Sequence, residues 1–264
     1  MEILKVNGLT KVYASFKGAK EVSALNGLNF TINSGEFVGI MGPSGSGKST
    51  LLNILSGVDK GTSGNVIINN NDISEMKKDK LALFRRKNIG YIFQEFNLLD
   101  SLTVEENISL PLILDKKEQS EIENSLNDLM KYFNILDLKK KYPYNISGGQ
   151  RQRVAAARAL INNPTIIFAD EPTGNLDSKS ANDVMTTIAK MNDEKSSTVL
   201  MVTHDPFAAS FCKRIIFIKD GKIKMEITSD GNRKKLFDKI LEVQSLIGGD
   251  INDLSCYHKK ELFL

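Results

Sequence analysis

The sequence predicts an α/β protein with a mostly parallel sheet, and two observations carry this prediction. Residues 37–41 form a continuous apolar run, typical of a strand buried on both faces, and a glycine-rich loop and a helix-like segment follow it directly. In the second half of the chain, strand-sized apolar runs alternate with helical segments. Because parallel strands need crossover connections, which are usually helices, this alternation favours a parallel sheet covered by helices.

The first third of the chain is expected to consist of short strands and turns around one helix. Residues 49–55 have the apolar spacing of a helix that stops near Gly57. Strands are expected at 66–68 and 89–93, and the polar residues 69–72 have the chemistry of a turn.

From about residue 98 to residue 162 the pattern changes to helix. Within this span, the apolar residues of segment 122–133 fall on one helical face, and Lys, Glu and Asn occupy the other. Strand character then returns, with one helix between the returning strands. We expect strands at 165–168, 198–202 and 214–219, and a helix at 179–191. From Ser229 onward, a short amphipathic helix and a tail containing Gly248 and Gly249 are expected.

Composition and charge exclude several classes of protein. With 2 Cys, 6 Pro and 0 Trp among 264 residues, the chain is neither a disulfide scaffold nor a proline-rich linker protein. The hydrophobic share of 41% is ordinary for a globular protein with a sizeable core. A formal charge of only +3 argues against a dedicated nucleic-acid-binding protein.

The sequence also predicts a cytoplasmic protein. The longest uncharged apolar stretches are strand-sized, far below the ~18 residues of a transmembrane helix. The first residues lack the basic, apolar and small-residue order of a signal peptide. Cys212 and Cys256 are therefore expected to be reduced thiols, and a small buried hydrophobe is the simpler interpretation of each than a redox group.

The glycine-rich loop after the first buried strand matches the phosphate-binding pattern G-x-x-x-x-G-K-[ST]. Backbone N–H groups in such a loop, together with the following helix N-terminus, can wrap a polyphosphate, while Lys48 reaches the β- and γ-phosphates and Ser49 binds Mg²⁺. The alternative is a purely structural glycine loop. The residues expected to contact the nucleotide here are Gly42, Pro43, Ser44, Gly45, Ser46, Gly47, Lys48, Ser49 and Thr50.

Two carboxylates follow the apolar strand at 165–168. Asp170 can support the Mg²⁺ shell, and Glu171, which points in another direction, is suited to orient or deprotonate an attacking water. Alone, such a pair is more typical of a solvated loop; together with a phosphate loop it predicts nucleotide hydrolysis.

A second anion site is expected where a Ser-Gly-Gly entry opens a helix. Ser147, Gly148, Gly149 and Gln150 precede a segment rich in helix formers, so a hydroxyl and unobstructed N–H groups meet at its start. The alternative is a plain Ser N-cap with a flexible glycine pair.

These motifs occur in one order along the chain: the phosphate loop, Gln94, Ser147–Gln150, Asp170–Glu171, Asp177 and His204. In this order the sequence resembles the nucleotide-binding subunits of ATP-binding cassette (ABC) transporters over nearly its whole length. The resemblance implies a P-loop NTPase (RecA-like) core with an N-terminal antiparallel β subdomain and a helical insert. It divides the chain into a cassette, residues 1–228, with a helical subdomain at about 95–162, and a C-terminal helix and tail, residues 229–264.

The resemblance also implies a site shared by two copies of the chain. Each copy would give its phosphate loop to one ATP·Mg²⁺ and Ser147 to the other. Tyr13 would stack on adenine, Gln94 would sense Mg²⁺ and the attacking water, Asp177 would communicate across the dimer, and His204 would contact the γ-phosphate. The implied catalytic residues are Lys48, Gln94, Glu171 and His204, and the implied Mg²⁺ ligands are Ser49, Gln94 and Asp170.

Some of these assignments leave alternatives open. Tyr13 could be an ordinary strand aromatic, and His204 a strand-end histidine satisfied by its neighbours. Two departures from the commonest family pattern are Ile146 in place of Leu and Gly174-Asn175 before Leu176-Asp177. Both are conservative enough that ATPase activity is still expected.

Longer matches point to one branch of the family. Segments 93–99, 102–107 and 168–177 are similar to exporters for lipoprotein release, macrolide efflux and antimicrobial-peptide resistance. Within that branch, segments 177–181, 204–212, 215–221 and 248–249 are most similar to bacitracin-type resistance ATPases. The resemblance implies that the chain sits at the inner face of the cell membrane and contacts an integral membrane permease through region 98–114. A sensor kinase that acts through the permease is a further candidate partner, and no nucleic acid is expected.

Other functions remain as alternatives. A non-transport cassette, acting in DNA repair, chromosome organisation or translation, usually carries a long insertion or two tandem cassettes, whereas one signature occurs here. The charge runs 85–87 and 139–141 are expected to be solvated surface; the alternative is contact with an acidic partner or an anionic membrane.

Overall fold

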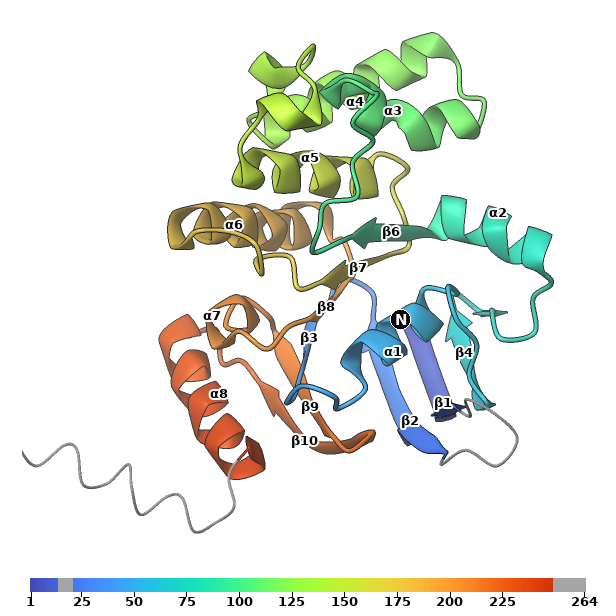
Figure 1. Cartoon of the computed structure of the whole chain (residues 1–264), viewed down its shortest axis with the longest axis vertical. Helices are drawn as coiled ribbons and strands as arrows, with labels where there is room; N and C mark the ends of the chain where they lie inside the picture. The colour runs from blue at the N-terminus through green and yellow to red at the C-terminus, as the bar shows by residue number, and fades with distance from the viewer. Residues whose placement is uncertain (14–20, 249–264) are drawn as a thin grey trace, which may run out of the picture.

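The computed structural model describes residues 1–13 and 21–248, and it has two sheets (Figure 1). The larger sheet has six strands in the order β10-β9-β3-β8-β7-β6, all parallel except β10. The predicted mostly parallel α/β sheet is therefore confirmed. Its strands are β3 (Phe37–Met41), β6 (Ile89–Ile92), β7 (Ile166–Asp170), β8 (Val199–Val202), β9 (Arg214–Lys219) and β10 (Lys222–Thr228).

The smaller sheet is antiparallel and has the order β2-β1-β4-β5. The turn between its last two strands uses Asn69 and Asn70, whose φ angles of 47° and 60° are in the left-handed region that two-residue hairpins need. Helix α1 lies between the two sheets (Figure 1). These elements are β1 (Glu2–Tyr13), β2 (Val22–Asn33), α1 (Lys48–Leu55), β4 (Ser63–Ile68) and β5 (Asn71–Asp72).

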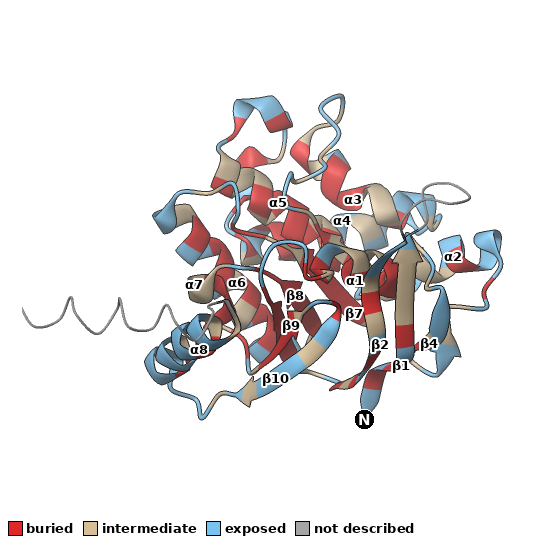
Figure 2. Cartoon of the chain, turned by 60° about the horizontal axis from the view of Figure 1, so that its bottom comes forward, coloured by how far each residue is buried: buried red, intermediate tan, exposed pale blue. Residues whose placement is uncertain are grey.

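The central strands β3, β7, β8 and β9 of the larger sheet are buried on both faces, whereas the edge strand β10 is largely exposed. Each face of the sheet has its own hydrophobic core. In β7, Ile166 and Phe168 pack into the core shared with α1 and the antiparallel sheet. Ile167 and Ala169 pack into the core shared with the helices. The resulting continuous apolar run is the signal that made these strands recognisable in the sequence, and Figure 2 shows their buried residues at the centre of the molecule.

Helices cover the second face. The predicted apolar face of segment 122–133 is confirmed: Leu126, Leu129, Met130 and Phe133 are buried, and Ile122 packs against them. The helical segments are α2 (Lys78–Asn88), α3 (Val104–Leu114), α4 (Gln119–Tyr132), the 3₁₀ turns η1 (Leu136–Leu138) and η2 (Pro143–Asn145), α5 (Gly148–Leu160) and α6 (Ser178–Lys195).

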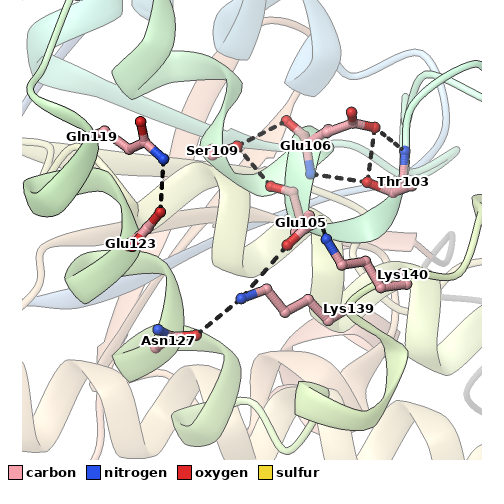
Figure 3. A network of polar contacts seen from close by, with 9 residues as sticks. All are labelled: Thr103, Glu105, Glu106, Ser109, Gln119, Glu123, Asn127, Lys139 and Lys140. Carbon is pink, nitrogen blue, oxygen red and sulfur yellow. Dashed lines mark hydrogen bonds and ion pairs between the residues drawn. The ribbon is translucent and has the colours of Figure 1, made fainter.

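A polar network ties the start of α3 to the segment that leads into α5 (Figure 3). Glu105 pairs with both Lys139 and Lys140, and the backbone N–H of Glu105 donates to the carbonyl of Lys139 at 3.1 Å. The prediction of plain solvated surface is therefore wrong for Lys139, which is only half exposed.

The charge run 85–87 also makes hydrogen bonds within the chain. Arg85 donates to the carbonyl of Gly57 at 3.0 Å, and Arg86 donates to that of Leu114 at 2.9 Å. These two guanidinium groups close α2 onto neighbouring segments, so the solvated-surface prediction is wrong for Arg85 and Arg86, which are half-buried, and holds for Lys87, which is exposed.

The C-terminal helix packs onto the main body beside α7 (Pro206–Ala209). It is α8 (Arg233–Gly248), longer than the short helix expected, and it buries Leu236, Ile240 and Val243 in the core of the helical face. Cys212 is buried in the same core, as predicted, whereas Cys256 and Gly249 lie outside the described residues. Within the described ranges, no helix is both long and apolar enough to cross a membrane.

Candidate active site

Four parallel strands that neighbour one another deliver the predicted residues to one edge of the sheet. The phosphate loop follows β3, His204 follows β8, Asp170 ends β7, and Gln94 follows β6. Because these strands are parallel, their carboxyl ends meet at the same edge, where open α/β sheets bind ligands.

The phosphate loop is shaped by backbone crowding at two of its glycines. A Cβ at Gly42 would lie 2.0 Å from the carbonyl oxygen of Ile218, and one at Gly47 would lie 2.4 Å from that of Ala24. Gly47 also has a φ of 99°, a conformation that side chains disfavour. Neither position can accept even alanine without moving backbone, so the loop keeps its bare amide surface.

Lys48 begins α1 and turns its ammonium group back over the loop. Its Nζ donates to the carbonyls of Gly42 and Pro43 at 2.8 and 2.9 Å. An ammonium has three N–H donors, so one remains for a ligand. Burial lowers the pKa of Lys48, and the charges of Glu171 and Asp170 oppose that shift.

The buried hydroxyl of Ser46 also indicates that the loop binds a polyphosphate. Ser46 Oγ is buried and has no hydrogen-bond partner among the described residues. A Cβ at Gly45 would meet open space. Buried polar atoms are normally satisfied, so the unpartnered Ser46 hydroxyl points to a ligand that completes the loop.

The two carboxylates that follow β7 differ in environment. Burial, reinforced by Glu171, raises the pKa of Asp170, while Lys48 opposes the rise. A bound cation would relieve this penalty on the ionised form. Asp170, the hydroxyl of Ser49 and the amide oxygen of Gln94 supply oxygen atoms of the kind that Mg²⁺ prefers, so these residues could hold the ion.

Glu171 is held firmly by its neighbours. Its φ is 44°, an uncommon value for a residue with a side chain, and its N–H donates to the carbonyl of Val202 at 2.9 Å. Thr203 Oγ1 donates to Oε2 at 3.1 Å. The second carboxylate oxygen meets His204, whose backbone N–H donates to it at 3.1 Å and whose Nδ1 lies 2.7 Å away.

Gln94 is positioned by the unusual Gly174-Asn175 pair. A Cβ at Gly174 would lie 2.8 Å from the side-chain nitrogen of Gln94. Asn175 Nδ2 donates to the backbone carbonyl of Gln94 at 3.3 Å. The departure from the commonest pattern therefore has a structural reason, since glycine leaves room for the Gln94 amide.

Ser147 caps α5 in a capping box, which is the local role that the sequence left open as an alternative. Its Oγ accepts from the N–H of Gln150 at 3.3 Å, and the Gln150 side chain accepts from the N–H of Ser147 at 2.9 Å. Asp177 caps α6 similarly, accepting from Lys179 and Ser180. Helices α1 and α5 pack on opposite faces of the larger sheet.

Gly149 joins these two caps. A Cβ at Gly149 would lie 2.8 Å from both Cβ and Oγ of Ser180. The glycine of the signature therefore permits the N-terminus of α5 to approach that of α6 closely.

Tyr13 ends β1, next to residues that the structure does not describe. The residue is 43% exposed, and its hydroxyl donates to Asp59 Oδ2 at 3.0 Å. Lys11 Nζ lies 4.7 Å from the ring centroid and also binds Asp59. The hydrogen bond and ion pair with Lys11 help lower the pKa of Asp59 against the opposing effect of burial.

Comparison with known proteins identifies the family. Residues 25–174, more than half of the chain, match the ABC transporter family. The chain belongs to the ABC transporter family. It is 51% identical to the uncharacterized ABC transporter ATP-binding protein YvcR of Bacillus subtilis, over 97% of this chain and 99% of that one. It is 47% identical to the bacitracin export ATP-binding protein BceA of Halalkalibacterium halodurans, over 96% and 100%.

A solved structure supports the fold and the activity. The cassette MJ0796, in a dimeric post-hydrolysis state bound to ADP and phosphate, has a TM-score of 0.78 and 43% identity, covering 87% of this chain and 100% of that one. The predicted ABC cassette fold is thus confirmed, and the chain is an ATPase of this family. Relatives named for lipoprotein release (40% identical) and macrolide export (41%) confirm the predicted exporter branch.

Sequence reasoning missed several residues of this site. Thr203, Asp59 and Gln244 had no motif, and only contacts between distant segments reveal them: Thr203 with Glu171, Asp59 with Tyr13, and Gln244 with His204. The position of Thr203, directly before the strand-end histidine, was the one available signal.

Proposed function

We propose that this ABC ATPase works as a pair of copies that close around two ATP·Mg²⁺ and power a separate membrane permease in resistance to bacitracin-like peptides. The likeness to BceA over 96% of this chain and all of that protein carries the peptide-resistance assignment. The arrangement of Glu171, Thr203 and His204 at the phosphate-loop edge supports the hydrolytic role.

The chemistry follows from where the charged groups lie. Lys48 and the loop N–H groups stabilise charge on the phosphate oxygens, and their fixed positions avoid reorganisation during the reaction. Glu171 orients the attacking water and accepts its proton, while Thr203 and His204 fix both carboxylate oxygens. Ser49, Gln94 and Asp170 would hold Mg²⁺, which when bound neutralises charge that develops on the phosphates.

The second half of each site comes from the other copy in this proposal. Ser147 and the first N–H groups of α5 would bind the γ-phosphate held by the partner's loop, and Asp177 would lie at the same junction. Tyr13 would stack on adenine through its exposed ring. His204 would contact the γ-phosphate.

A groove on the helical side suits contact with a permease. A pocket of about 530 Å³ between α2, β6, α3 and α5 is lined by apolar residues that include Tyr91, Phe93 and Leu110, and by Arg86 and Arg158. A short helix from the cytoplasmic side of a permease could enter it. Docked there, the chain would sit at the inner face of the cell membrane, and a sensor kinase would connect through the permease.

The hydrolytic role is tested with Glu171→Gln. Removing the proton acceptor should lower turnover by about 100-fold or more while ATP binding persists, so an ATP-bound dimer accumulates on size-exclusion chromatography. Glu121→Gln, at an exposed surface ion pair, is the matched control. Turnover of E171Q at the parent rate would contradict the assignment.

The biological role is tested in a bacitracin-sensitive bacterium that expresses the chain with its permease. Expression should raise the bacitracin concentration needed to stop growth, and the E171Q variant should not. Protection against macrolides, or restored lipoprotein release, would instead support the related transporters that share this branch.

A further inference from the structure

We propose that Gln244 of α8 is a positioning residue for His204, so that the C-terminal helix sets the geometry of the active site. This inference rests on the proposed role of His204 at the γ-phosphate. The observation that carries it is one hydrogen bond: Gln244 Nε2 donates to the backbone carbonyl of His204 at 3.2 Å.

The backbone of His204 is held on both sides. On one side, its N–H donates to Glu171 Oε1 at 3.1 Å, and Nδ1 lies 2.7 Å from the same oxygen. On the other side, its carbonyl accepts from Gln244. The side chain itself is 70% exposed, so these polar contacts, and not surrounding atoms, orient the imidazole.

Helix α8 is a stiff support for this contact. Near its start, the Arg233 guanidinium lies 3.4 Å from the centroid of the Phe211 ring and 4.7 Å from that of Phe207, and its Nε donates to Ser210 Oγ at 2.9 Å. Near its end, Lys219 Nζ donates to the carbonyl of Ile247 at 2.5 Å. Both ends are therefore tied to segments that flank the site.

The end of α8 also borders the phosphate loop. Gln244 and Ile247 line a pocket of about 290 Å³ together with Gly42, Ser44 and His204. A shift of α8 would therefore change the surroundings of His204 and the loop together.

Loss of the Gln244 donor should affect catalysis more than the stability of the fold. The His204 carbonyl lies in an exposed residue, so water can replace the lost donor and the fold changes little. Catalysis is more sensitive, because small displacements of a catalytic group lower the rate of the chemical step.

The test measures ATP turnover of the full chain. Gln244→Met keeps the length of the side chain but removes the donor; it should lower kcat about tenfold, or about 1.4 kcal/mol, with KM for ATP and Tm unchanged. Gln244→Lys restores a donor and should recover most of the rate. Ser245→Ala, the neighbouring exposed position, is the control and should match the parent. Parent-like kcat in Q244M, or no recovery in Q244K, would overturn the proposal.

A second comparison keeps this inference separate from the function on which it rests. His204→Ala should abolish most turnover, and adding Q244M to it should have no further effect. If H204A retains the parent rate, the proposed role of His204 fails. If H204A is inactive while Q244M is fully active, only the positioning role of Gln244 fails.

Discussion

The phosphate loop leads into the N-terminus of α1, and Ser147 stands at the N-terminus of α5. The two helix starts differ in how many of their polar groups find a hydrogen-bond partner within the chain. At the loop, Ser46 Oγ lacks a partner among the described residues, and Lys48 has a donor to spare. At α5, Ser147 and Gln150 cap each other reciprocally. The loop therefore has unused hydrogen-bonding groups and can bind an anion within one chain. The start of α5 is already capped, so it is suited to contact a nucleotide that the loop of another copy holds.

The largest difference between the two helix starts should appear in the ATP affinity of a single copy. Lys48→Ala removes charge-assisted hydrogen bonds to the phosphates and should weaken ATP binding by about 2 to 3 kcal/mol, or about 30- to 150-fold. Isothermal titration at a concentration that keeps the protein monomeric measures this, with Lys5→Ala, exposed on β1, as control. Unchanged ATP affinity in K48A would argue against the loop as the primary site.

Ser147→Ala should leave the ATP affinity of a single copy unchanged and lower ATP turnover at least about tenfold. It should also cost about 1 kcal/mol of stability, because the α5 cap is lost, so Ser147→Asn serves as the cap-preserving comparison.

Mixing the two impaired variants, K48A and S147A, gives the sharper result. In a head-to-tail pair, one site receives both defects and the other receives neither, so ATPase activity should return. No recovery on mixing would show that Ser147 acts within its own chain.

The same contrast explains how much the sequence could predict. Strands 37–41 and 214–219 are predicted at their observed bounds, because burial on both faces produces uninterrupted apolar runs. Helix α6 extends past the predicted end at Met191, because Asn192 is buried and donates to the carbonyls of Gly35 and Ser197. Such hydrogen bonds depend on tertiary contacts that no local pattern contains.

The active-site residues divide in the same way. Lys48 and Asp170 lie in local motifs whose spacing alone predicts chemistry. Gln244 meets His204 only because α8 folds back onto α7, and Asp59 meets Tyr13 only through pairing within the antiparallel sheet. Supporting residues of this kind become visible only in the folded chain.

A smaller effect is expected at Gly174, which lies against Gln94. Gly174→Ala would place a methyl group 2.8 Å from the Gln94 amide nitrogen and displace it, lowering turnover about threefold to tenfold with ATP affinity unchanged. Gly61→Ala, whose Cβ would lie equally close, 2.8 Å, to the side chain of Leu9 and far from Gln94 in the sequence, tests whether crowding at any glycine has the same effect. Equal losses in both variants would argue against a specific role for Gln94.

The smallest effect concerns the cap of α6. Hydrogen bonds from Ser180 and Lys179 lower the pKa of Asp177 below its ordinary value. The fold therefore favours the ionised form, and its stabilisation is fully present above the unfolded pKa of about 3.9 and lost as the pH falls through the lower folded value. Asp177→Asn keeps the cap without the charge, so Tm should match the parent near pH 7.

The dependence of Tm on pH in the acid range distinguishes the effect of the Asp177 charge from the effect of its capping hydrogen bonds. Between about pH 4 and 2, Tm of the parent should fall more steeply than that of D177N, because only the parent must protonate a group whose charged form the fold favours. Parallel curves would mean that the hydrogen bonds to Asp177 do not favour its ionised form. Because Asp177 is exposed, the difference in Tm should also shrink with added salt. The loss of ATP affinity in K48A should depend less on salt, because the Lys48 ammonium that it removes is buried against the loop.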